Sequence, residues 1–424
     1  MGAKALKSQP QVTACPVRKR TGRFSWMHSR AEHEFMINTP FPRLRIRDHD
    51  LLPVIQGGMG VGVSGHRLAG TVAKHGAVGT VASVDLRRLY PDIMTRLRKC
   101  KDAASHGAAN VEALDREINA ARALAGPNGF IAVNVMRALS NYAELVVQAC
   151  KSGANAIVSG AGLPFDLPDL TECFPNVALI PILSEERGVR AVLKRWSRKG
   201  RTPDAVIIEH PRYAGGHLGA TRIEDVSDAR FDFSRVIEGI RKVFEEIGIA
   251  FERIPLIPSG GINSFQKIST AFELGASGVQ IGTPFAVTQE CDAHPNFKKV
   301  LAEAGPQDIV TFMSSAGLPA RAVLTPWLKR YLAKEGRLRA SACPHPAGNH
   351  CPNKVECLAF CGFKDGNQTA GQFCIESQLA AAQRGNIEKG LFFRGSESLP
   401  FGSEIRTVLD LLQRLLTDPC EITA

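Results

Sequence analysis

The chain has 424 residues, of which 44% are hydrophobic and 22% charged, as is typical of a soluble globular protein. Its formal net charge is +11, but the basic residues are scattered along predicted helices without a recognisable RNA- or DNA-binding module, so nucleic acid is not expected as a partner. No apolar run is long enough to span a bilayer, and the N-terminus lacks the apolar core of a signal peptide. These features exclude a membrane-spanning protein and predict a cytoplasmic one.

A strand–helix unit repeats along most of the chain. Residues 1–50 are predicted to be an irregular leader, with frequent Pro, Arg and His and no sustained period. Beyond it, eight apolar runs predict strands, at 53–58, 77–84, 130–136, 154–160, 177–183, 205–209, 255–259 and 278–282. Helix-like patterns lie between most of them, which implies a parallel sheet. Eight units favour an α/β fold of the (β/α)8 TIM-barrel class, with an open doubly wound sheet as the alternative.

The sixth predicted strand leads into a turn with two glycines and a histidine. The sequence from 203 to 220 is PDAVIIEHPRYAGGHLGA. The run 205–208 is typical of a strand covered on both faces, and Gly215 and Gly216 would let the backbone approach a flat ligand. An imidazole beside such backbone can act as acid or base near neutral pH. His217 is therefore a candidate catalytic residue, although the segment taken alone favours a structural histidine.

The seventh and eighth strands each end in a turn that suits a phosphate. Residues 254–283 predict a strand, a Ser-Gly-Gly turn, a helix and a second strand that ends at Gly282 and Thr283. Gly260 and Gly261 allow the backbone to come close to an anion, and the N–H groups of these turns can bind the phosphate of a mononucleotide. In a barrel, functional residues are expected on the face where the strands end.

Glycines and small polar residues recur at the other strand ends, as a flat cofactor across the barrel mouth would require. In order, these motifs resemble those of the nitronate monooxygenase family, formerly called 2-nitropropane dioxygenases. The same superfamily includes flavin-dependent enoyl-acyl-carrier-protein reductases and NAD(P)H:quinone reductases. The motifs are Gln56-Gly57-Gly58-Met59, Val133-Asn134, Ser159-Gly160-Ala161-Gly162-Leu163-Pro164, Ala214-Gly215-Gly216-His217, Ser259-Gly260-Gly261-Ile262 and Gly278-Val279-Gln280-Ile281-Gly282-Thr283.

The resemblance implies an FMN-binding TIM barrel that acts on a small-molecule substrate. His217 falls on the family's catalytic histidine, where it would bind an anionic nitronate or remove the α-proton of a nitroalkane. Oxygen would complete the reaction. By motif position, the residues that would contact FMN are Gly58 and Met59 at the ring, Asn134 at the ring or ribityl chain, and Gly215, Gly260, Gly261, Gln280, Gly282 and Thr283 at the ribityl chain and phosphate.

Two positions before His217 depart from the family pattern. The residue seven places earlier, usually Gln or Glu, is His210, and the usual Glu four places earlier is Tyr213. Both side chains can exchange protons, so His210 is a second catalytic candidate and Tyr213 a further acid or base. Substitutions that serve only packing are the alternative for both.

Five of the eleven cysteines are crowded between residues 343 and 374. A cytoplasmic protein should not use them as structural disulfides, so a metal centre is the first hypothesis. Their loop-rich spacing suits a [4Fe-4S] cluster, and part of it resembles the cluster-binding run of iron–sulfur flavoproteins of the dienoyl-reductase kind. Structural zinc, aided by His345 and His350, is the alternative. The predicted ligands are Cys351, Cys357, Cys361 and Cys374, with Cys343 as a substitute for Cys351.

The patterns divide the chain into a leader at 1–50, an FMN-binding barrel at 51–335, a Cys-rich segment at 336–380 and a helical tail at 381–424. An apolar stripe from Ile405 to Leu416 predicts a helix that packs on the barrel or across a homodimer.

Arg321 is expected near the flavin, where it would pair with the phosphate or an anionic substrate, with a solvated arginine as the alternative.

Three functions are compatible with these features. The first is FMN-dependent oxidation of a small nitronate or related carbanion by O2, which needs no NAD(P)H. The second is reduction of an enoyl, quinone or similar acceptor, with a cysteine-bound cluster that relays electrons to FMN from NAD(P)H or a ferredoxin-like donor. The third is a non-catalytic redox sensor or RNA-associated flavoprotein, which only the cysteines and the positive charge suggest.

Overall fold

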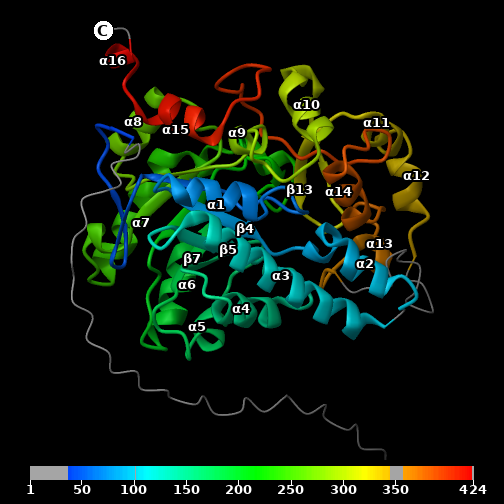
Figure 1. The fold of residues 1–424 in the computed structure, drawn as a ribbon, viewed down its shortest axis with the longest axis horizontal. Coiled ribbons are helices and arrows are strands. Elements are labelled where there is room, and N and C mark those ends of the chain that lie inside the picture. Colours follow the sequence, from blue (N-terminus) through cyan, green and yellow to red (C-terminus); the bar gives the residue numbers. More distant parts are fainter. Residues whose placement is uncertain (1–36, 101, 344–356, 423–424) are drawn as a thin grey trace, which may run out of the picture. The chain divides into compact units, whose positions relative to one another are not determined.

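A closed barrel of eight parallel strands lies at the centre of the fold (Figure 1). The computed structural model describes residues 37–100, 102–343 and 357–422. The barrel strands are β3 (Val54–Gln56), β4 (Val78–Ala82), β5 (Phe130–Asn134), β6 (Ala156–Ser159), β7 (Ala178–Leu183), β8 (Val206–Glu209), β10 (Leu256–Ser259) and β11 (Val279–Ile281). Each coincides with a predicted run, so the predicted (β/α)8 TIM barrel is confirmed.

Both faces of the barrel strands are buried. Alternate residues form one cluster that fills the lumen, and the residues between them pack beneath the helices. Because neither face meets water, the strands have continuous apolar sequences, which is why they could be recognised. The lumen cluster includes Ile55, Val78, Ala132, Val158, Ile180, Ile207 and Ile257. The outward cluster includes Val81, Ile131, Val133, Ile157, Leu179, Val206 and Ile208.

Helices between the strands cover the outside of the barrel. They bury one face each: α7, for example, buries positions 236, 237, 240, 243 and 244, which follow the helical period. These helices are α1 (His66–Lys74), α2 (Pro91–Leu97), α3 (Ala103–Ala125), α4 (Tyr142–Lys151), α5 (Leu167–Leu170), α6 (Glu186–Ser197), α7 (Phe233–Glu246) and α8 (Phe265–Glu273), with the short 3-10 turns η1 (Leu86–Leu89), η2 (Glu224–Ser227), η3 (Ala229–Phe231) and η4 (Phe251–Arg253).

The helix that completes the outer ring comes from the C-terminal tail. α15 (Val408–Leu416) contacts both α1 and α8, at the position after the last barrel strand. It begins with a capping box, in which Thr407 and Asp410 each accept a hydrogen bond from the other's backbone N–H. The apolar stripe predicted in the tail therefore packs on the barrel, and a homodimer stays a prediction. The buried face consists of Val408, Leu411, Leu412, Leu415 and Leu416.

A short hairpin within the predicted leader covers the amino end of the barrel. β1 (Leu44–Ile46) and β2 (His49–Leu51) pair antiparallel. Leu44, Ile46 and Leu51 are buried in the lumen cluster, and His49 packs edge-on against Phe130, the first residue of β5. Strands of three residues are too short for a period to be recognised, so the predicted boundary at residue 50 falls inside the hairpin.

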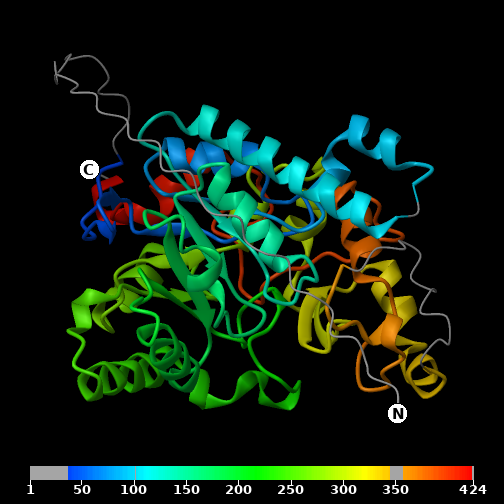
Figure 2. The same cartoon turned by 90° about the horizontal axis from the view of Figure 1, so that it is seen from below.

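The segment after β11 adds structure beside the barrel mouth. Its sheet has the order β12-β13-β9, with β12 (Ile309–Met313), β13 (Pro319–Val323) and the two-residue β9 (Gly216–His217). Figure 1 and Figure 2 both show α11 to α14, in yellow and orange, gathered on one side of the barrel. The remaining elements are α9 (Thr283–Ala286), α10 (Pro295–Glu303), η5 (Pro306–Asp308), α11 (Pro326–Leu332), α12 (Glu335–Ala340), α13 (Gly362–Asp365), α14 (Ile375–Gln383) and α16 (Pro419–Ile422). Within the described ranges, no helix is both long enough and apolar enough to cross a bilayer.

Gly79 in β4 provides a test of how closely α1 packs on the barrel. A Cβ at this position would lie 1.8 Å from the carbonyl oxygen of Ala69. We expect Gly79→Ala to lower the free energy of unfolding by about 1–3 kcal/mol or more, because the helix must move away. Gly107 in α3 is the control, since no described residue outside its own helix backbone lies within 4 Å of its Cβ position. Gly107→Ala should raise the free energy of unfolding by about 0.5–1 kcal/mol. Urea unfolding measures the change in unfolding free energy of both variants. Equal changes would contradict the close packing of α1 on β4.

Candidate active site

A cavity of about 790 Å³ opens at the carboxyl ends of the barrel strands. Its size lies within the range of roughly 300–1,000 Å³ found for small-molecule and cofactor sites. The structure brings nine predicted cofactor residues and one predicted catalytic residue together around it, although they come from five separate parts of the sequence. These residues are Gly58, Met59, Asn134, Gly215, Gly260, Gly261, Gln280, Gly282, Thr283 and His217.

Gly58 and Asn134 approach each other at the mouth, after β3 and at the end of β5. A Cβ on Gly58 would lie 2.3 Å from the Cβ of Asn134, so only glycine permits this approach. The next residue, Met59, is fixed by its N–H group, which donates to Ser64 Oγ at 2.8 Å. These residues form the part of the cavity wall at which the resemblance predicts the flavin ring.

The turn after β10 requires glycine for two reasons. Gly260 and Gly261 have φ values of 103° and 80°, in the left-handed region that glycine adopts without strain. A Cβ on Gly261 would also lie 2.9 Å from Cγ of Tyr213. The turn leads to α8, where Ser264 Oγ accepts a hydrogen bond from the N–H of Lys267. Backbone N–H groups near the start of a helix suit a phosphate, as the sequence predicts.

Gln280 carries an acceptor that a ligand could satisfy. Its Nε2 donates to Ser259 Oγ at 3.0 Å, which orients the amide. Its Oε1 is buried and has no hydrogen-bond partner among the described residues. Leaving a buried acceptor unpaired costs about 1–3 kcal/mol. FMN fits this position because its ring carries an N–H donor.

His217 is held by a second sheet outside the barrel, which the sequence did not predict. The barrel strand β8 ends at Glu209, and the chain turns before it forms β9. There His217 lies opposite Ala320 of β13 in an antiparallel pair, and Leu218 N–H donates to the carbonyl of Pro319 at 2.8 Å. The strand predicted at 205–209 is confirmed as β8, and the support of His217 was not predicted because it comes from pairing with a segment about a hundred residues away.

The imidazole of His217 is neutral at neutral pH. Burial lowers its pKa to about 4. Its Nε2 has no hydrogen-bond partner within the described part of the chain, and its ring packs edge-on against Phe393 with centroids 5.6 Å apart. A neutral imidazole with an open nitrogen can donate or accept one hydrogen bond, according to its tautomer.

Arg321 supports the turn that leads to His217. It lies in β13 and is buried, and its Nη1 donates to the carbonyl oxygens of Pro211 at 3.0 Å and Ala214 at 2.5 Å. Arg321 does not line the cavity. The expected pairing with a phosphate or an anionic substrate is thus replaced by a structural role, because the guanidinium satisfies backbone acceptors.

His210 lies beside the cavity wall and does not line it. Its ring packs edge-on against Tyr213 and against Phe233 of α7, with centroids 4.7 and 5.2 Å away. Its Nε2 lies 3.5 Å from Asp232 Oδ1, and its Nδ1 accepts from the N–H of Arg212 at 3.3 Å. These contacts are the ones expected if His210 serves only packing. A catalytic role for His210 stays a prediction, and its side chain does not line the cavity.

Glu209, the last residue of β8, lines the cavity but is not among the residues predicted from the sequence. Burial raises the pKa of its carboxyl group to about 7. A signal was present: alternation along a strand places 205, 207 and 209 on one face, and Ala205 and Ile207 belong to the lumen cluster. An acidic residue at a lumen position of a strand buried on both faces marks a functional group.

Three of the predicted metal ligands lie near one another, beside the cavity. Cys357 lines it, and burial raises the pKa of this thiol, with further contributions from Glu376 and from the nearby Cys361 and Cys374. Cys351 lies outside the described residues. Among the residues with described positions, no three His, Cys, Asp or Glu side chains are arranged to hold a metal ion. The predicted centre is thus not formed by Cys357, Cys361 and Cys374 alone.

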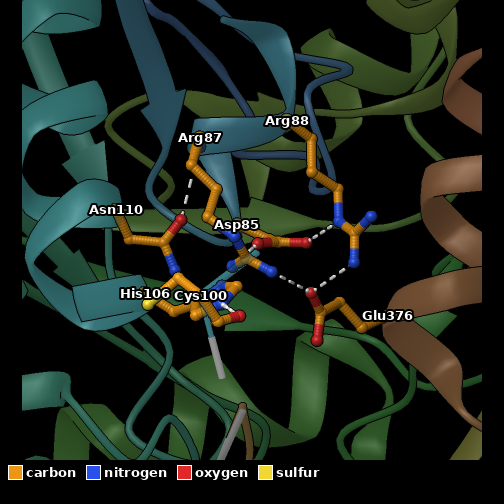
Figure 3. Close-up of polar contacts among 7 residues, drawn as sticks. All are labelled: Asp85, Arg87, Arg88, Cys100, His106, Asn110 and Glu376. Atoms are coloured by element: carbon orange, nitrogen blue, oxygen red, sulfur yellow. Dashed lines mark hydrogen bonds and ion pairs between the residues drawn. The ribbon is translucent and has the colours of Figure 1, made fainter. Parts of the chain in front are cut away.

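A buried ion-pair network joins the Cys-rich side of the protein to the barrel (Figure 3). Arg87 and Arg88 of η1 both donate to Oε1 of Glu376 on α14, at 2.9 and 2.8 Å. Both arginines also pair with Asp85. Asn110 of α3 accepts a hydrogen bond from the N–H of Arg87. The network fixes the start of α14, which carries Glu376 to the cavity wall.

The chain shows clear similarity to proteins of known sequence and structure. The family model described as nitronate monooxygenase matches residues 48–418. A Bacillus subtilis protein named "probable nitronate monooxygenase" is 27% identical over 168 residues, 40% of this chain and 40% of that protein, so the chain matches less than half of this relative. FabK from Thermotoga maritima has a TM-score of 0.62 at 21% identity, over 90% of this chain and 97% of that one. A nitroalkane oxidase from Streptomyces ansochromogenes has a TM-score of 0.58 at 18% identity, over 91% and 97%. At these identities, the comparison shows that the two proteins have the same fold as this chain.

The protonation of His217 can be measured directly. We expect its imidazole to stay neutral down to about pH 4, because burial disfavours the charged form. The unfolded chain binds its proton near pH 6.5, so the stability contributed by a neutral His217 is complete above 6.5 and is lost as the pH falls towards 4. NMR of ring-labelled histidine, with His217→Gln to assign the signal, measures the pKa. A value near 6.5 would contradict the buried position.

Removal of Glu376 should destabilise the protein strongly. In Glu376→Leu, Arg87 and Arg88 lose a shared acceptor at a buried site, and we expect the free energy of unfolding to fall by about 3–5 kcal/mol. Glu404→Leu is the matched control, because Glu404 forms an exposed pair with Arg406 that should contribute at most about 1 kcal/mol. Urea unfolding compares the two variants. Similar losses would show that the network does not stabilise α14.

Proposed function

The chain belongs to the nitronate monooxygenase family, and on that premise we propose that it is an FMN-dependent oxidoreductase that oxidises a small nitronate or a related carbanion with O2. The observation that carries this proposal is the single cavity that the nine cofactor positions share with His217. A small-molecule substrate and a location in the cytoplasm belong to the same proposal.

FMN would lie across the barrel mouth. The turns at Gly260 and Gly261 and at Gly282 and Thr283 would bind its phosphate through backbone N–H groups. The free Oε1 of Gln280 would accept a hydrogen bond from its ring. When bound, FMN supplies the acceptor for substrate electrons and their passage to O2.

His217 would hold the substrate above the ring. A neutral imidazole that carries its proton on Nε2 can donate one hydrogen bond to a negatively charged nitronate oxygen. The ring does not have to carry a charge itself, which burial opposes. Apolar residues complete the wall, among them Ile182, Leu318 and Phe393. Such a lining suits a small organic anion whose charge is confined to one end.

A reductase with a cysteine-bound centre is a second candidate, and the position of Cys357 favours it. This thiol lines the cavity and lies close enough to Cys361 and Cys374 for their charges to act on it. With a ligand from outside the described residues, such as Cys351, a [4Fe-4S] cluster or a zinc ion would have four sulfur ligands. A cluster there would relay electrons to FMN from NAD(P)H or a ferredoxin-like donor.

The two candidates differ in electron source and metal content. Protein purified without oxygen should contain about one FMN per chain and should consume O2 with a nitronate when NAD(P)H is absent. His217→Ala should lower kcat/KM about 10²-fold or more. His75→Ala is the control, because His75 does not line the cavity. Iron with matching sulfide, together with turnover that requires a reduced donor, would instead support the reductase.

A further inference from the structure

We propose that Glu209 is the residue that exchanges a proton with the substrate, and that His217 binds the substrate as a neutral hydrogen-bonding group. This inference rests on the proposed function. It assigns proton transfer to a carboxyl group at the top of the lumen, in place of the imidazole.

The strand register places Glu209 in the uppermost layer of the lumen. It lies beside Ser259 of β10 in the parallel pair of β8 and β10, and Ser259 in turn lies beside Gln280 of β11. Ser259 and Gln280 are joined by a side-chain hydrogen bond, and all three residues line the cavity. Glu209 therefore belongs to the same polar layer as the predicted FMN contact at Gln280.

The carboxyl group of Glu209 differs from the other acidic groups of the cavity in having no side-chain partner among the described residues. Glu185 pairs with Arg187, Glu376 with two arginines, and Glu397 with Lys267. Within the described ranges, no ion pair or side-chain hydrogen bond involves the carboxyl of Glu209. Gly219 lies nearby: a Cβ added at this glycine would lie 3.8 Å from Glu209 Oε2 and 1.8 Å from Ser184 Oγ. The titratable groups that face the cavity from the remaining elements are His217, Tyr213 and Cys357.

Desolvation reverses the usual order of basicity in this cavity. Burial raises the pKa of Glu209 to about 7 and lowers that of His217 to about 4. A proton that enters the site therefore resides on the carboxyl group. Near neutral pH Glu209 is present in both forms, so it can accept a proton as carboxylate or give one as carboxylic acid.

The proposed step is a proton transfer without change of oxidation state. The carboxylate oxygen of Glu209 takes the α-proton of a nitroalkane, the C–H bond breaks, and its electron pair stays on the substrate, which becomes the nitronate. An O–H bond forms on Glu209, and the proton later passes to solvent. A nitronate offered as the substrate has already lost its α-proton and does not need this step. The role of Glu209 therefore differs between a nitroalkane and its nitronate.

Kinetics with a matched pair of substrates tests the assignment. For Glu209→Gln loaded with FMN, kcat/KM for a nitroalkane should fall about 10²-fold or more, while kcat/KM for the nitronate of the same carbon skeleton should change much less. The flavin content confirms that the variant folds. Glu246→Gln is the matched control, since Glu246 forms an exposed pair with Arg190 and does not line the cavity. Equal losses for both substrates in Glu209→Gln, or the selective loss in Glu246→Gln, would overturn the inference.

An infrared titration tests the proton on Glu209 without turnover. Between pH 5.5 and 8.5, apo and FMN-loaded protein should lose a carboxylic acid band with a midpoint near 7, and Glu209→Gln should lack it. Glu246→Gln should retain the band, because the exposed pair with Arg190 lowers the pKa of Glu246. A midpoint near 4.5 would overturn the inference. If the band is present but neither substrate is oxidised, the proposed function fails while the protonation of Glu209 stands.

Discussion

The barrel closes where β11 pairs with β3, with Val279 beside Val54 and Ile281 beside Gln56. This contact joins segments more than two hundred residues apart, and all other parts of the site depend on it. Since all eight strands run in the same direction, closure brings their carboxyl ends to one mouth. Glycines and amides that are far apart in the sequence then surround one cavity. Without closure, the turn after β10 and the end of β5 would belong to no common site.

A second group of contacts covers the mouth from one side. Pairing of β9 with β13 fixes His217, and the C-terminal segment passes so close to this turn that a Cβ on Gly215 would lie 2.5 Å from the backbone of Arg394 and Gly395. The N–H of Gly395 donates to the hydroxyl of Thr283 at the predicted phosphate turn. The tail also supplies α15 to the outer ring. The region after the barrel is therefore part of the active-site architecture.

Desolvation determines the chemistry of the cavity. Ion pairs satisfy most of the acidic groups around it, including Glu376 in its buried network with Arg87 and Arg88. In the part of the chain that the structure describes, Glu209 and His217 have no such partner, and burial shifts their pKa values in opposite directions towards the neutral forms. A site of this kind can bind an anionic substrate through the neutral imidazole of His217. It also lets a carboxyl group carry the proton that an imidazole would carry in water.

The sequence alone determined the eight strands, because strands buried on both faces are continuous apolar runs, and it predicted many of the residues that line the cavity, because these lie at or just after the strand ends. Only the tertiary structure decided the rest. Adjacent residues point to opposite faces, so the end of β8 determines that Glu209, and not His210, lines the cavity. The sheet that holds His217, the backbone acceptors of Arg321 and the place of α15 in the ring depend on partners distant in sequence. A local sequence pattern shows that a segment must pack or pair with another segment, but which segment that is depends on the fold of the whole chain.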